Sequence, residues 1–185
     1  MENKIINNNE IERLSVQDIV VDDVPSILEL LSKSSREMYL GAGYTEQEYA
    51  DKYKDSTSVE SVKKTIENIF PIGQNEKYLV VKDDGQVIGF CYAERGDEKN
   101  VLNAIYLLPQ YQGKGVGKKL WTNMSSFLDL SKETYLTVFA ANTKAIDFYK
   151  KLGFVKTGKI IEEDSRQGKN GTVVQEIEMV LRPDF

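Results

Sequence analysis

The sequence predicts a mixed α/β (α+β) fold in a single domain, with a largely antiparallel sheet flanked by helices. Three observations lead to this prediction. Short β-like runs alternate with amphipathic helical segments along the chain. Two hairpin signals, Asp83-Asp84-Gly85 and Gly168-Lys169-Asn170-Gly171, lie between apolar runs. A glycine-rich stretch, Pro109 to Gly117, separates a strand-like run from a helical one.

The length and net charge of the chain favour a single globular domain and argue against proteins that bind membranes or nucleic acid. The 185 residues suit one domain with a real core, with residues 1–10 expected to be flexible. No apolar run approaches the ~18 residues of a membrane span. The net charge of −5 argues against nonspecific binding of nucleic acid, which needs a basic face. Neither a membrane nor a nucleic acid is therefore an expected partner.

The N-terminal half is predicted to contain a strand followed by two helices. The strand lies within Ile11 to Val21, and Asp23 is the predicted N-cap of the first helix. Residues 35–57 are polar and rich in tyrosine. Thr57 to Glu60 has the spacing of a capping box and predicts a second helix that ends near Phe70-Pro71.

The C-terminal half is predicted to be mostly strand, with two further helices. One helix runs from Val116 to about Asp129, and the other is N-capped by Asn142 and ends before Gly153. The predicted strands are Lys77–Lys82, Gln86–Glu94, Val101–Leu108, Thr134–Phe139, Phe154–Glu163 and Val173–Leu181.

The glycine-rich stretch has the order strand, turn, helix, which suits the binding of phosphate groups. Backbone N–H groups can approach a ligand closely where glycine carries no side chain, and a helix N-terminus adds unpaired donors. A P-loop is excluded because no Ser or Thr follows either Gly-Lys pair. The dinucleotide pattern G-x-G-x-x-G is also missing, since the chain reads G-x-G-x-G.

Two motifs resemble those of the GCN5-related N-acetyltransferase (GNAT) superfamily. Gln112, Gly115 and Gly117 form Gln-x-x-Gly-x-Gly, which is similar to that family's pyrophosphate loop. Residues 142–154 resemble its second cofactor motif, N-x-x-A-x-x-F-Y-x-x-x-G-F. Two motifs in this order are far more specific than either alone. The resemblance covers about residues 77–181, the expected cofactor-binding core.

The resemblance implies acetyl-CoA as co-substrate and no metal. In that family the fourth and fifth strands splay apart, and the pantetheine arm lies in the gap. Tyr149 is the implied catalytic acid, which protonates the leaving thiolate. The implied cofactor-binding residues are Ile105, Tyr106, Leu107, Gln112, Gly113, Lys114, Gly115, Val116, Gly117, Lys118, Asn142, Ala145, Phe148 and Tyr149.

Simpler interpretations stand beside these roles. Residues 105–107 could be only core strand residues, and Asn142 could be only a helix cap. Ala145, Phe148 and Tyr149 could simply pack in the core.

Neither a nucleophile nor a general base is evident in the sequence. The chain has no histidine, which excludes His-dependent nucleophile systems. Its one cysteine, Cys91, lies in an apolar run, so transfer through an acyl-cysteine is not expected. Many relatives carry a glutamate on the fourth strand, but residues 101–105 include no carboxylate. The nearest are Glu94, Asp97 and Glu98, whose simplest interpretation is a solvated turn, and Tyr106 could order a water instead.

The leading hypothesis is direct acetyl transfer to a primary amine of a small molecule. A polyamine fits if Glu94, Asp97 or residues 162–164 line the acceptor cleft. The alternatives are a protein N-terminal or lysine acetyltransferase and a non-catalytic acyl-CoA sensor. The single cysteine and the polar first nine residues favour the cytoplasm, and the resemblance implies a homodimer.

Overall fold

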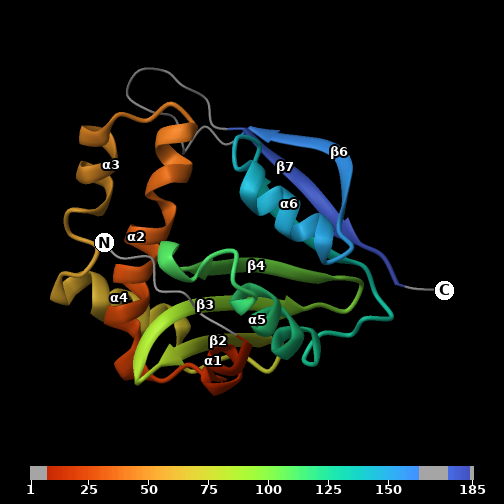
Figure 1. Cartoon of the computed structure of the whole chain (residues 1–185), viewed down its shortest axis with the longest axis horizontal. Coiled ribbons are helices and arrows are strands. Elements are labelled where there is room, and N and C mark those ends of the chain that lie inside the picture. The colour runs from red at the N-terminus through yellow and green to blue at the C-terminus, as the bar shows by residue number, and fades with distance from the viewer. Residues whose placement is uncertain (1–7, 163–174, 184–185) are drawn as a thin grey trace.

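A computed structural model describes residues 8–162 and 175–183 as one seven-stranded sheet with helices packed on it (Figure 1). The strand order is β1-β2-β3-β4-β5-β7-β6. All neighbouring strands are antiparallel except β4 and β5, which are parallel. The strands are β1 Ser15–Asp18, β2 Glu76–Asp83, β3 Gln86–Arg95, β4 Asn100–Leu107, β5 Thr134–Phe139, β6 Val155–Glu162 and β7 Gln175–Leu181. The predicted fold class is confirmed, whereas the predicted turn at 168–171 lies outside the described residues.

The helices cover the sheet, with α2 packing against β3 and β4 and α5 packing against β2, β3 and β4. The α-helices are α1 Asn8–Arg13, α2 Val24–Gly41, α3 Glu46–Tyr53, α4 Val59–Ile69, α5 Val116–Ser125 and α6 Thr143–Lys151. Two short 3₁₀ helices, η1 Val21–Asp23 and η2 Pro109–Tyr111, precede α2 and α5. No helix in the described part of the chain is long and apolar enough to cross a membrane.

Helix α5 ends at Ser125, about one turn before the predicted end at Asp129. The Ser125 and Ser126 hydroxyls donate to the carbonyls of Thr122 and Asn123, at 3.1 and 2.7 Å. Such bonds from side chain to backbone compete with the helical pattern. The apolar periodicity misled the prediction because residues just beyond the helix still contribute to the core.

Helix α1 was not predicted from the sequence. Its C-terminal end is stabilised by a lysine that is distant in the sequence. Lys119 Nζ donates to the carbonyl oxygens of Ile11 and Glu12, at 2.8 and 3.1 Å. These carbonyls belong to the last turn of a helix, where no intrahelical partner exists. A helix this short shows no apolar periodicity, so the sequence carried no signal for it.

Asp23 is the N-cap residue of α2, as predicted, but its side chain makes no capping hydrogen bond to the helix. Its carboxylate instead accepts a hydrogen bond from the Val20 N–H and forms an ion pair with Lys82 of β2, at 2.6 Å. Both charged groups are largely buried, so leaving Lys82 without its partner would cost more than leaving the helix uncapped.

The capping box predicted at Thr57 is also displaced. Ser58, one residue later, is the N-cap of α4, and its Oγ accepts from the Ser61 N–H at 3.2 Å. The capping box that does form starts helix α3, where Thr45 and Glu48 exchange hydrogen bonds. The same T-x-x-E spacing occurs at both places, so spacing alone does not identify the cap.

Replacing Ser58 with alanine is expected to lower the free energy of unfolding by about 1 kcal/mol, because it removes the N-cap of α4. Urea denaturation of the two variants Ser58→Ala and Thr57→Ala measures this. Thr57→Ala, the control, is expected to change stability much less. The reverse order of effects would contradict the cap assignment.

Candidate functional site

The glycine-rich loop leads into a start of α5 that no side chain caps. Gly113 and Gly115 have φ angles of +71° and +86°, the left-handed region that residues with a side chain rarely adopt. Gly115 occupies the N-cap position of α5 and has no side chain to donate or accept. The first turn of α5 thus suits an external acceptor such as a pyrophosphate.

Two side chains fix the loop to the sheet. The Tyr111 hydroxyl donates to Asp83 Oδ2 at 2.7 Å, at the turn between β2 and β3. Gln112 Nε2 donates to the carbonyl oxygen of Leu107 at 3.2 Å. The glutamine of the motif therefore joins the loop to the end of β4.

Gly117 lets α6 approach the first turn of α5. A Cβ atom at this position would lie 3.1 Å from two ring atoms of Phe148 and 3.6 Å from Leu107. The shorter distance is tighter than ordinary packing in a protein interior, so a larger residue would push α6 away. The two motifs, far apart in the sequence, thus meet at Gly117 and Phe148.

Strands β4 and β5 pair only at their first residues and then separate. The pairs are Asn100 with Thr134 and Val101 with Tyr135. On its other side β4 pairs with β3, with one extra residue, Asn103, in the register. Such a bulge bends a strand. The splay that the resemblance implied is present, and it leaves an edge of β4 that suits pairing with a peptide-like ligand.

The second motif provides a helix cap and part of the core. Asn142 Oδ1 accepts from the Ala145 N–H at 3.1 Å, which confirms its role as the N-cap of α6. Gly153 follows the helix with a φ of +96°. Ala145 and Phe148 are half-buried and pack against the main core. Their contacts with a cofactor stay a prediction.

Tyr149 is buried in the core, on the inner side of α6. Its ring packs against Phe148 and Phe154, with centroids 5.3 and 5.8 Å apart. Burial raises the pKa of the Tyr149 phenol well above its usual range, and the nearby Tyr106 and Cys91 raise it further. Tyr149 therefore keeps its proton at neutral pH.

Cys91 is unsuited to carry an acyl group. The side chain is fully buried in the core, and burial raises the pKa of its thiol far above the usual range. The reactive species would be the thiolate, which this environment disfavours. The buried thiol of Cys91 thus argues against a route through an acyl-cysteine.

The three carboxylates near β4 lie in two different settings. Asp97 and Glu98 are exposed in the β3–β4 turn, as expected. The interpretation of Glu94 as part of a solvated turn is wrong, because it lies in β3 and is half-buried. It accepts hydrogen bonds from Tyr92 and from Asn103 Nδ2, the latter at 2.9 Å. Of residues 162–164, only 162 is described, and it is exposed at the end of β6.

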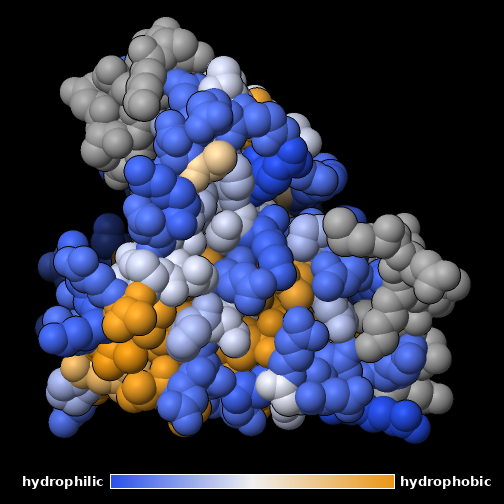
Figure 2. Space-filling view, turned by 90° about the vertical axis from the view of Figure 1, so that its left-hand side faces the viewer, coloured by the Kyte–Doolittle hydropathy of each residue, from blue (hydrophilic) through white to orange (hydrophobic). Residues whose placement is uncertain are grey.

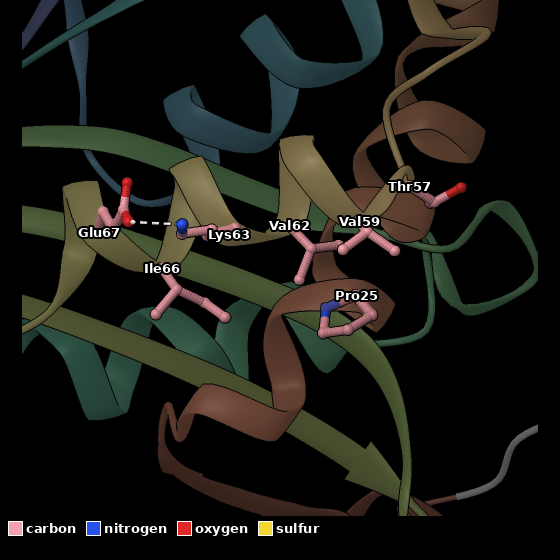
Figure 3. A pocket seen from close by; sticks show the side chains of 7 residues that line it. All are labelled: Pro25, Thr57, Val59, Val62, Lys63, Ile66 and Glu67. Atoms are coloured by element: carbon pink, nitrogen blue, oxygen red, sulfur yellow. Dashed lines mark ion pairs between the residues drawn. The ribbon is translucent and has the colours of Figure 1, made fainter.

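An apolar groove lies elsewhere on the molecule, between α4 and the start of α2. Figure 2 shows apolar side chains gathered on the side of the molecule that carries these helices. In Figure 3, Pro25 of α2 faces Val62 and Ile66 of α4, beside the ion pair of Lys63 and Glu67. None of the residues predicted to bind the cofactor lines this groove. In the described ranges, no group of three or more His, Cys, Asp or Glu side chains could hold a metal ion.

Comparison with known proteins identifies relatives for much of the chain. The family model described as "Acetyltransferase (GNAT) family" matches residues 27–154. An uncharacterized N-acetyltransferase of Mycobacterium tuberculosis is 34% identical over 83 residues, which cover 43% of this chain and 53% of that protein. Peptidyl-lysine N-acetyltransferase YjaB of Salmonella typhimurium is 31% identical over 87 residues, covering 47% and 55%. The chain thus spans about half the length of these curated relatives.

A solved structure shows the same fold. The PaiA N-acetyltransferase of Thermoplasma acidophilum, crystallised in complex with coenzyme A, superposes with a TM-score of 0.58. It is 22% identical, and the match covers 91% of this chain and 98% of that one. At this identity the likeness shows the fold alone. The family model, however, matches well over half of the sequence, so the chain belongs to the acetyltransferase (GNAT) family.

Proposed function

We propose that this protein transfers an acetyl group from acetyl-CoA directly to a primary amine of a small molecule. One observation carries the proposal: the start of α5, the phenol of Tyr149 and the edge of β4 lie together where β4 has separated from β5. Each suits one part of the donor, namely its pyrophosphate, its thioester and its pantetheine amides.

The residues present fit this donor. Backbone N–H groups of residues 112–118 would hold the pyrophosphate, and Lys114 and Lys118 add positive charge to this stretch. The edge of β4 at Ile105, Tyr106 and Leu107 would pair with the pantetheine amides as an added strand does. When bound, acetyl-CoA supplies an acetyl group activated as a thioester.

Tyr149 would act at the sulfur. The amine nitrogen forms a bond to the carbonyl carbon, the carbon–sulfur bond breaks, and the Tyr149 hydroxyl gives its proton to the departing thiolate. The nitrogen loses one proton to water as the amide forms, and a proton from water restores the Tyr149 hydroxyl. A buried phenol with a raised pKa stays protonated until the thiolate forms, and the same dry surroundings raise the proton affinity of the thiolate.

Two other functions stay open. The likeness to a peptidyl-lysine N-acetyltransferase favours a protein lysine or N-terminal acceptor as the second candidate. A sensor that binds acyl-CoA without turnover would need the glycine-rich loop but not the phenol of Tyr149.

Among small amines, a polyamine suits the acidic net charge of the chain. The single cysteine, Cys91, forms no disulfide, which suits the reducing cytoplasm. A homodimer stays an expectation.

The test of this proposal is thiol release from acetyl-CoA with a panel of acceptors: polyamines, amino acids, aminoglycosides and peptides with free amines. Turnover is expected with at least one class of small primary amine, and product masses should show one added acetyl group. Turnover with peptides alone would replace the small-molecule proposal by the protein acceptor. Acetyl-CoA binding without turnover on any acceptor would indicate a sensor.

A further inference from the structure

Two glutamates face each other across the β2–β3 hairpin. Glu76 of β2 is the direct cross-strand partner of Glu94 of β3, and both are half-buried. Like charges placed directly opposite each other in an antiparallel pair destabilise it. The pair is therefore locally unfavourable for the sheet. Residues that are kept despite such a local cost are typical of positions that serve binding or catalysis.

A single phenol bridges the two carboxylates. The Tyr92 hydroxyl contacts Oε1 of Glu94 and lies 3.1 Å from Oε1 of Glu76. It has one proton, so it can donate to only one of them at a time. Tyr78 stacks on Tyr92 with ring centroids 4.1 Å apart, and its hydroxyl lies 3.4 Å from Glu76 Oε1. Burial and the hydrogen bond with Glu94 raise the pKa of Tyr92, which keeps this phenol neutral.

No positive side chain in residues 8–162 and 175–183 forms an ion pair with either glutamate. The two cations next to them in the sequence are engaged elsewhere: Lys77 pairs with Asp18 at 2.5 Å, and the Arg95 guanidinium lies 5.1 Å from the centre of the Phe127 ring. Two half-buried negative charges are thus left without a cation. This contrasts with the buried ion pair that Lys82 forms on the same sheet.

The neutral donors around the pair do not replace a cation. Asn103 Nδ2 donates to Glu94 at 2.9 Å, and the Gly73 N–H donates to Glu76 at 3.0 Å. These bonds hold the two carboxylates in place but leave their charge uncompensated. An ammonium group, with three donors and one positive charge, supplies what the pair lacks.

The pair shares a sheet face with Tyr106. Gly89 of β3 points toward α5, since a Cβ atom there would lie 3.2 Å from Leu120. Alternation along the strand therefore turns Phe90, Tyr92 and Glu94 to the opposite face. Tyr106 lies directly opposite Phe90 and is near enough to Tyr149 to raise the pKa of that phenol. The face that carries the glutamates thus continues to the residues proposed for acetyl transfer.

The pair also lies close to the point where β4 leaves β5. Ala104, just after the bulge, is the cross-strand partner of Tyr92. Glu94 is two residues beyond Tyr92, about 7 Å along the strand. A small molecule that extends from the edge of β4 could therefore reach the carboxylates with a second group.

We propose that Glu76 and Glu94 determine acceptor specificity by binding a second cationic group of the acceptor, so that the preferred substrates are small diamines or polyamines. This inference rests on the proposed function and specifies its substrate class. A cation between the carboxylates removes their repulsion, while Tyr92 and Asn103 hold Glu94 in place. The amine that reacts is then the one at the other end of the same molecule.

The test compares diamines of about four to eight carbons with monoamines of equal length, in the full-length wild type and in Glu94→Gln and Glu76→Gln. We expect the wild type to have a higher kcat/KM for the best diamine than for the monoamine of equal length. Each variant should raise the KM for that diamine about tenfold, which corresponds to the loss of one hydrogen bond to a charged group. Values of kcat, and KM for the monoamine, should change little. Glu98→Gln removes an exposed carboxylate from the adjacent turn and is the matched control.

A binding measurement separates this inference from the proposed function. Calorimetry should show that the diamines bind the wild type and bind both variants more weakly, whether or not any amine is acetylated. Equal kcat/KM for diamine and monoamine in the wild type would overturn the inference and leave the acetyltransferase proposal intact.

The control and a stability measurement complete the test. Weaker diamine binding in Glu98→Gln, equal to that in Glu94→Gln, would overturn the inference, since overall charge would then be responsible. Thermal unfolding checks that the variants fold. Because each variant loses the Glu–Glu repulsion, it should be at least as stable as the wild type.

Discussion

Replacing Tyr149 with phenylalanine is expected to lower kcat by about 100-fold, the lower end of what a general acid contributes. The affinity for coenzyme A should stay within about twofold, because the hydroxyl serves the transition state and not the ground state. Phenylalanine keeps the ring contacts with Phe148 and Phe154. Steady-state kinetics on the acceptor found by the panel, with calorimetry of coenzyme A binding, measures both quantities.

The matched control for this variant is Tyr135→Phe. Tyr135 also carries a hydrogen-bonded phenol, which contacts Glu133, but it lies at the start of β5 where the strands are still paired. This control should retain wild-type kcat. Unchanged kcat in Tyr149→Phe would remove the acid role, and water would then protonate the thiolate. A parallel loss of stability and affinity would instead show that Tyr149 matters for packing alone.

The features that the sequence predicts correctly have local causes. Asp84 and Gly85 form the predicted turn with φ of +46° and +82°, a conformation that an Asp-Gly pair adopts readily. Asn142 caps its own helix through an N–H three residues on. Each of these structures depends on side chains a few residues apart, so the order of residues along the chain is enough to predict it.

The site features that the sequence missed depend on pairing between distant segments. From the turn at Asp84 and Gly85 alone, a regular hairpin would place Glu76 opposite Ala93. One extra residue in β3, Ile88, shifts the register and places Glu76 opposite Glu94 instead. A bulge shows no clear signal in a sequence, so the carboxylate pair could not be predicted.

The other differences between prediction and structure arise where a residue bonds to a partner distant in the sequence instead of to a local one. Asp23 has the residue type and position of an N-cap, but Lys82, far along the chain, takes its carboxylate. Helix α1 also depends on a distant partner, because Lys119 of α5 donates to a carbonyl oxygen in its last turn. Local patterns predict which bonds a residue can make, and tertiary packing decides which one it does make.

Replacing Gly115 with alanine is expected to raise the Kd for coenzyme A on the order of 30-fold. With a φ of +86°, an alanine here costs about 1–2 kcal/mol in the left-handed region, and relief of that strain turns the loop away from the geometry proposed for the pyrophosphate. Space is not the obstacle, because the nearest atom to the added Cβ would be Ile11 Cδ1 at 3.4 Å. Calorimetric titration with coenzyme A gives the affinity.

Gly158→Ala separates the effect of backbone strain from an effect on binding, because Gly158 has nearly the same φ, +92°, and open space around its added Cβ. It lies in β6, outside the glycine-rich loop and the turn that anchors it, so the backbone cost is matched while the proposed donors are untouched. Both variants should lose similar stability in urea, and only Gly115→Ala should lose affinity. Wild-type affinity in both variants would mean that the loop binds no pyrophosphate. Equal losses of affinity would mean that general destabilisation, and not the backbone geometry at Gly115, weakens binding.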